Sequence, residues 1–206
     1  LWDYRTAQDL EDERSISSGT GSWQELLKAH DIDTVVNSQY DSIFDNFTPV
    51  HKLPDWKLVY VDSDAVIYAR KDIIKKLPVD LSYIQPHKAY YPINLSFDLK
   101  DQDEAIKQLQ GLIKYDNKNA FARSQLILYN LNYKNNLDTA KKFALESRNL
   151  IPLDPIFNFY IAAIYSRENK CEQALAFARE MKQKSYGDAN LKNTMNIELS
   201  RCSQKL

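Results

Sequence analysis

Residue types that do catalysis or hold metal ions are few in this chain, and they lie far apart. The three histidines, His30, His51 and His87, fall in separate segments without the spacing of metal ligands. The acids of Asp62-Ser63-Asp64 flank a serine as in many hairpin turns, so we interpret them as a turn and not as a cation site. Only four glycines occur in 206 residues, and they form no glycine-rich phosphate loop. The sequence therefore predicts no catalytic residue, no metal site and no cofactor, and we expect that the chain is not an enzyme.

The composition is that of a folded protein without an excess of either charge. Hydrophobic residues make up 44% of the chain and aromatic residues 12%, which is ample for a core. The 27 basic and 28 acidic residues give a net charge of −1, so we expect no nucleic-acid partner, which would need clustered positive charge. No apolar run approaches the roughly 18 to 20 residues that cross a bilayer. The chain starts at Leu1 without an initiator methionine, which favours a piece of a longer protein over a trimmed complete one.

The second half of the chain repeats a helical pattern. Ala105, Ala140 and Ala174 stand 35 and then 34 residues apart in similar segments, and Pro152 follows Ala140 by twelve positions. A small residue at this period, with a proline after the second helix, resembles the helix pairs of tetratricopeptide repeats (TPR). We expect residues 101–206 to form an all-α, TPR-like helical solenoid with two full repeats, a half repeat before them and a C-terminal capping helix. In the first full repeat the helices should cover about 121–133 and 137–150.

The resemblance to tetratricopeptide repeats also implies a binding groove, because in that family the first helix of each pair lines a concave face. The matching positions in this sequence are Gln125, Tyr129, Asn132, Tyr133, Phe159 and Arg167. Aromatic and amide side chains suit an extended peptide, and Arg167 would bind a carboxylate. The alternative is that Tyr129 and Phe159 pack against the neighbouring helix as core residues. The expected partner is therefore a protein or a peptide.

The two cysteines have a geometric relation if the helices form pairs. Cys171 begins the helix around Ala174, and Cys202 ends the next, antiparallel helix. Helices of equal length bring those two ends side by side, so that a disulfide could join them. Two buried thiols are the alternative.

The first half of the chain predicts a small sheet. Ser22 precedes a short amphipathic stretch that ends near His30, which is typical of a capped helix. Residues 32–37 are rich in β-branched side chains and predict a short strand. Two strand-forming runs around a short polar turn predict a hairpin over Trp56–Arg70. We expect an α+β protein overall, with a small α/β sheet module at 1–77, a connector at 78–100 and the helical repeats after it.

The order of landmarks in residues 1–71 resembles a known family. Asp3-Tyr4-Arg5 is followed by Trp23-x-x-Leu26-Leu27, by Ile32-Asp33-x-Val35, and by the runs Trp56-Lys57-Leu58-Val59-Tyr60 and Ala65-Val66-Ile67-Tyr68-x-Arg70. This arrangement resembles the extracytoplasmic C-terminal domain of bacterial multi-spanning membrane glycosyltransferases (GT-C type) related to protein mannosyltransferases, which tetratricopeptide repeats often follow. The resemblance implies a place on the extracytoplasmic, periplasmic side of a bacterial membrane and a membrane-embedded parent protein. The catalytic acid and the sugar site would lie upstream, so the resemblance supplies no catalytic residue here.

The favoured function is therefore a non-catalytic module that binds a protein or peptide, and two other functions stay open. The aromatic side chains Trp23, Trp56, Tyr60 and Tyr68 could stack on sugar rings. The sheet module would then bind a glycan or a lipid-linked sugar acceptor as an accessory domain. A stand-alone cytoplasmic TPR scaffold is the third function.

Overall fold

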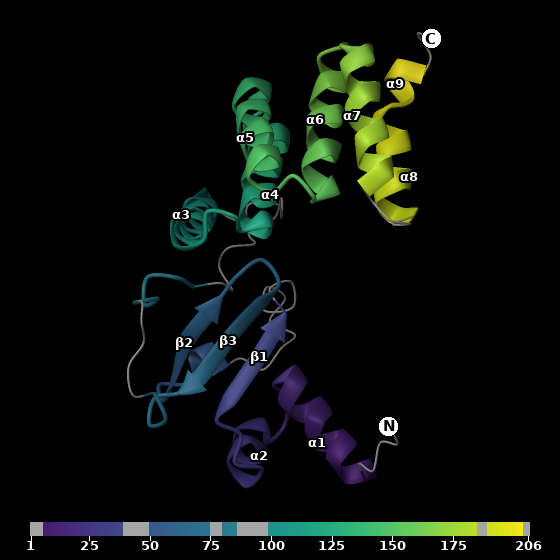
Figure 1. The fold of residues 1–206 in the computed structure, drawn as a ribbon. Coiled ribbons are helices and arrows are strands. Elements are labelled where there is room, and N and C mark those ends of the chain that lie inside the picture. Colours follow the sequence, from purple (N-terminus) through teal and green to yellow (C-terminus); the bar gives the residue numbers. More distant parts are fainter. Residues whose placement is uncertain (1–5, 39–49, 75–79, 86–98, 185–188, 204–206) are drawn as a thin grey trace. The chain divides into compact units, whose positions relative to one another are not determined.

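The fold class is α+β, in which a three-stranded antiparallel sheet is combined with helices (Figure 1). The computed structural model describes residues 6–38, 50–74, 80–85, 99–184 and 189–203. The chain forms two compact units, 1–115 and 116–206. The elements of the first unit are α1 (Ala7–Ser18), α2 (Trp23–Ala29), β1 (Thr34–Ser38), the 3-10 turn η2 (Val50–Lys52), β2 (Trp56–Val61), β3 (Ala65–Arg70) and α3 (Leu99–Tyr115). Those of the second unit are α4 (Ala120–Leu128), the π turn η5 (Tyr129–Tyr133), α5 (Leu137–Leu150), α6 (Pro155–Arg167), α7 (Cys171–Lys184), α8 (Ala189–Glu198) and α9 (Ser200–Ser203).

The sheet has the strand order β1-β3-β2, so that β1 and β2 are its two edges (Figure 1). β2 and β3 form the antiparallel hairpin expected over Trp56–Arg70, with a bulge between Leu58 and Tyr60. Val35 of β1 and Leu58 of β2 pair with Tyr68 of β3 from its two sides. All three of these side chains are buried, so they mark the inner face of the sheet.

The helix α3 belongs to the first unit and packs against the segment around Tyr83. The backbone N–H of Gln85 donates to Gln108 Oε1 at 2.7 Å. A Cβ atom added at Gly111 would lie 3.5 Å from the ring of Tyr83. Ala105, the first alanine of the repeat pattern, is therefore buried in a helix that the structure groups with the sheet, although the predicted bounds group it with the helices. Of the predicted connector at 78–100, the structure describes residues 80–85 and the start of α3.

Polar residues begin the helices of the second unit and separate them. Asn119, Asn136 and Asp154 cap α4, α5 and α6, and each side chain accepts a backbone N–H group from the first turn of its helix. Asn135 and Asn169 adopt positive φ angles of 47° and 60° in the connections before α5 and α7. Asparagine tolerates this left-handed conformation better than most residues, so the chain can reverse there without a glycine.

Two buried clusters hold the helices of the second unit together. The first is formed by residues of α4, η5, α5 and α6. It contains Ile127, Leu131, Ala140, Ala144, Phe157, Tyr160, Ile161 and Ile164. The second joins α6, α7, α8 and α9 through Ala162, Ala174, Ala178, Met181, Met195, Leu199 and Cys202. The repeat residues Ala140 and Ala174 are both fully buried, because small side chains let neighbouring helices approach closely.

The first helix of this unit differs from the uninterrupted helix that the sequence predicts for 121–133. α4 ends at Leu128, and the chain continues as the π turn Tyr129–Tyr133. The backbone N–H of Lys134 donates to Tyr129 O at 3.2 Å and closes this wider turn. The side chains after Leu128 consequently point in directions that a regular helix would not give them.

Candidate functional site

Three of the six residues assigned to the predicted groove lie in the π turn. They are Tyr129, Asn132 and Tyr133. The rings of Tyr129 and Tyr133 stack with their centroids 5.9 Å apart, and Lys134 Nζ lies 5.6 Å from the centroid of Tyr129. Tyr129 is buried and Asn132 is exposed, so the turn combines a packed aromatic pair with an accessible amide. Single π turns within helices are frequent at functional sites.

Arg167, in the last turn of α6, connects this π turn to α8. Its Nη1 atom donates to Asn132 Oδ1 at 3.2 Å, and its Nη2 atom lies 3.5 Å from Glu198 Oε1. The side chains of Arg167 and Glu198 are 28% and 29% exposed. We call these three residues the Asn132–Arg167–Glu198 row. The guanidinium thus holds a carboxylate of its own chain, while the row keeps donors and acceptors that water or a ligand can reach.

A cavity of about 310 Å³ lies beside this row. Its walls are Ser166, Arg167, Ile197, Glu198 and Ser200. The Ile197 side chain is 73% exposed. The cavity therefore offers an accessible apolar side chain next to the ion pair of Arg167 and Glu198. Ile197, Glu198 and Ser200 were absent from the groove predicted by sequence, which ends at Arg167. The repeat period could have found Ser200, which stands 34 residues after Ser166, but not Glu198, which stands 31 residues after Arg167.

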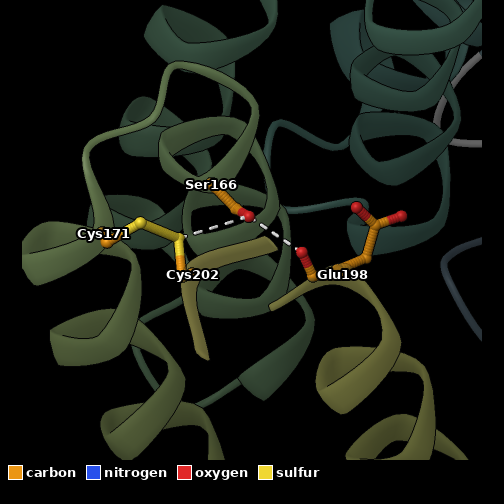
Figure 2. The surroundings of a disulfide bond; sticks show 4 residues. All are labelled: Ser166, Cys171, Glu198 and Cys202. Atoms are coloured by element: carbon orange, nitrogen blue, oxygen red, sulfur yellow. Dashed lines mark hydrogen bonds between the residues drawn. A yellow bond between two sulfur atoms is a disulfide. The ribbon is translucent and has the colours of Figure 1, made fainter. Parts of the chain in front are cut away.

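A disulfide lies next to the helices that line this cavity. Cys171 and Cys202 are bonded, with their Cα atoms 5.3 Å apart, and they join the start of α7 to α9 (Figure 2). Ser166 Oγ donates to the backbone oxygen of Glu198 at 2.8 Å and lies 3.7 Å from Cys202 Sγ. Figure 2 shows Ser166 between the disulfide and the Glu198 carbonyl. The disulfide and this hydroxyl therefore fix the end of α8 against α6.

Two polar atoms among the predicted groove residues are buried without a hydrogen-bond partner in the described part of the chain. They are Gln125 Oε1 and Tyr133 Oη. Burial raises the pKa of the Tyr133 hydroxyl above its ordinary value, so this hydroxyl stays protonated and can donate. An unpartnered buried group costs about 1 to 3 kcal/mol, which a ligand that supplied a partner would recover.

The sixth predicted residue, Phe159, is partly buried at the border of the core. It packs against both buried clusters and meets Tyr160 edge to face, with ring centroids 5.5 Å apart. Its contacts are those of the alternative left open above, in which this side chain packs against a neighbouring helix.

The first unit contains a cavity of about 670 Å³ beside the sheet. Trp56 and Tyr68 line it, together with the polar side chains of His51, Ser82 and Gln85. Burial raises the pKa of Tyr68 well above its usual range, so its hydroxyl is neutral. Two of the four aromatic residues considered for sugar stacking thus share one cavity wall. Of the other two, Trp23 is buried in α2 and Tyr60 is 40% exposed.

The residues that the structure describes include no group of three or more histidine, cysteine, aspartate or glutamate side chains placed to hold a metal ion. None of the described helices is both long enough and apolar enough to cross a membrane.

Comparisons with known proteins give no relative for this chain: no family model matches it, and neither a curated protein nor a solved structure matches it.

Proposed function

We propose that the helical half of this chain is a TPR-like solenoid that binds an extended segment of a protein partner without catalysing a reaction. The observation that supports this function most is the Asn132–Arg167–Glu198 row. It connects the π turn after α4 with the C-terminal ends of α6 and α8 and lies beside a cavity lined by an exposed isoleucine. An amide, a guanidinium and a carboxylate in one row can bind the main chain and a charged side chain of an extended peptide.

We further propose that the chain is an extracytoplasmic part of a membrane glycosyltransferase-like protein. The landmarks of residues 1–71 support this proposal, and so does the disulfide between Cys171 and Cys202. Disulfides persist in oxidising compartments and are rare in the cytosol. The bond therefore counts against the alternative of a cytoplasmic scaffold.

The binding function is tested by selecting peptides from a random library with the whole chain and measuring their affinities by fluorescence anisotropy. Arg167→Ala should weaken the selected peptides by about tenfold or more, because a lost charge-assisted hydrogen bond costs about 1.5 to 3 kcal/mol. The matched control is Arg179→Ala, which removes the same side chain from an exposed position on α7. We expect its affinity to stay within about twofold of wild type. Equal affinities for all three proteins would contradict the proposed site.

A second variant separates binding from folding. Tyr133→Phe removes a hydroxyl that has no partner among the described residues, so we expect unchanged or slightly higher stability in urea. If a ligand pairs with this hydroxyl, the same variant should bind the selected peptides less tightly. If Tyr133→Phe lowers stability but leaves the peptide affinity unchanged, the hydroxyl stabilises the folded chain and does not bind the ligand.

Sugar binding by the first unit is the second candidate function. The cavity lined by Trp56 and Tyr68 favours it, because aromatic rings and neighbouring amides and hydroxyls are the groups that hold sugar rings. Probing a glycan array with the same wild-type and Arg167→Ala chains separates the two candidates. Glycan binding that is equal in both chains, with no peptide selected, would favour the second.

A further inference from the structure

The two edges of the small sheet differ in how they are protected against another strand. β2 carries Lys57 and has a bulge between Leu58 and Tyr60, and both features discourage strand addition. β1 has the uncharged sequence TVVNS, without proline, lysine or a bulge in its pairing with β3. Among the described strands, only β3 pairs with β1. β1 is thus the edge at which a further strand could be added.

The register shows which backbone groups of β1 face outward. The N–H of Arg70 donates to Asp33 O at 3.0 Å, so this pair is hydrogen-bonded across the ladder. Because such pairs alternate along antiparallel strands, Val35 also bonds to β3. The N–H and C=O groups of Thr34 and Val36 consequently point away from β3. They are the donors and acceptors that an added strand needs.

A cavity of about 530 Å³ lies along this edge, between β1 and α1. Its size falls within the range of about 300 to 1,000 Å³ that is usual for ligand sites. Ile16 of α1, Ile32 and Val36 give it an apolar wall, and Val36 is 63% exposed. α1 has no buried residue of its own, and Figure 1 shows it beside β1. An added strand would therefore gain apolar contacts with both elements.

Acidic side chains of α1 line the same cavity. Asp9, Asp12 and Glu13 of α1 face the cavity, and His30 is the one basic side chain among the residues described there. Asp12 Oδ2 lies 2.8 Å from His30 Nε2, and this hydrogen bond lowers the pKa of Asp12, so the carboxylate is ionised at neutral pH. The cavity thus has an excess of negative charge, which favours a cationic occupant.

We propose that the edge of β1 is a second binding site, which takes an extended, lysine- or arginine-bearing peptide as a fourth strand between β1 and α1. Backbone hydrogen bonds to Thr34 and Val36 would hold the strand. The acids of α1 would select the positive side chains. A second copy of this chain fits less well, because its own acidic α1 would approach the first one.

The test uses the whole chain and a short acetylated and amidated peptide in which lysine alternates with valine. Val36→Pro removes an outward N–H without removing a bond to β3, since the Val36 N–H faces away from that strand. Val36→Thr is the matched control, which keeps the N–H. We expect Val36→Pro to bind at least about tenfold more weakly than wild type, and Val36→Thr to bind within about twofold of it. Arg167→Ala should bind this peptide as wild type does, which separates this site from the proposed groove.

Two further peptides make the result decisive. A glutamate–valine peptide should bind at least about tenfold more weakly, because the acids of α1 repel it. A lysine–valine peptide methylated on alternate backbone nitrogens should also bind poorly to the wild-type chain. This second comparison needs no protein variant, so it decides the matter if Val36→Pro does not fold. Equal binding of the methylated and unmethylated peptides, or of the lysine and glutamate peptides, would overturn the proposal.

Discussion

At the scale of single residues, the second unit relies on ion pairs that are partly shielded from water. Lys141 donates to Glu168 Oε1, and Lys170 Nζ lies 2.9 Å from the other oxygen of the same carboxylate. Only 12% of the Glu168 side chain is exposed. Burial alone would raise the pKa of Glu168, but the hydrogen bonds from the two lysines outweigh it and lower the pKa below the ordinary 4.5. The ionised form of this carboxylate therefore stabilises the folded state.

Glu168→Gln should lower the free energy of unfolding at pH 7 by about 1 to 3 kcal/mol, because it leaves two lysines without their carboxylate. A carboxyl with a lowered folded pKa stabilises the protein above its unfolded pKa, and the contribution disappears as the pH falls through the folded pKa. The difference between variant and wild type should therefore be full at pH 7 and shrink below about pH 4. Urea unfolding at both pH values measures it.

The control for this prediction is Glu172→Gln, which neutralises an exposed glutamate in the first turn of α7. It should change stability by no more than about 0.5 kcal/mol at either pH. If the difference in unfolding free energy between Glu168→Gln and wild type stays constant from pH 7 to pH 3, the charge of Glu168 is not the cause of the lost stability.

The candidate residues could be predicted from sequence only as positions on a helix face. A repeat period gives the face, and it predicted Asn132 and Arg167, which the structure brings into hydrogen-bond contact. The period does not give the partners of a side chain. The carboxylate beside Arg167 is Glu198, from a helix that follows later in the chain, and Gln125 is buried at a position where an exposed amide was expected.

At the scale of elements, the bounds of a regular helix were predicted well, and the interruption of a helix was not. The second helix of the first predicted repeat has the expected bounds, Leu137–Leu150, because caps and apolar spacing act within a few residues. The π turn could not be predicted, although the spacing from Ala105 to Ala140 contained a hint. That spacing is one residue longer than the next, and a π turn holds one residue more than an α turn.

The disulfide is the element-scale constraint with the largest expected effect. Cys171 and Cys202 are separated by 31 positions, and closing a loop of that length restricts the unfolded chain by about 3 to 4 kcal/mol on the chain-entropy model. Reduction should therefore lower the urea midpoint of the second unit. The m-value, which is the slope of the unfolding free energy against urea concentration, should rise, because the unfolded chain without the bond exposes more surface.

Thiol titration in denaturant before reduction is the control for this prediction. The oxidised protein should show no titratable thiol, and the reduced protein should show both cysteines. Two titratable thiols before reduction would mean that the helices form without the bond. An unchanged urea midpoint after complete reduction would mean that the bond adds nothing to the stability of the unit.

At the scale of the whole molecule, the main question is where the second unit begins. The sequence-based bounds place the start at residue 101, because Ala105 begins the repeat pattern. The structure groups α3 with the sheet unit and begins the second unit at residue 116. Gln108 of α3 accepts its hydrogen bond from Gln85, and the buried residues of the two clusters described above lie between Ile127 and Cys202.

Two fragments, 101–206 and 116–206, distinguish these bounds. If α3 is a part of the first unit, the shorter fragment should fold cooperatively with its disulfide, and both fragments should share one urea midpoint. A unit of this size can fold alone when a disulfide supports its core. If α3 is instead the half repeat that begins the solenoid, its removal exposes the apolar face of the next helix pair. The shorter fragment should then unfold at lower urea or bind a hydrophobic dye, as truncated repeat arrays do when they lack a terminal cap.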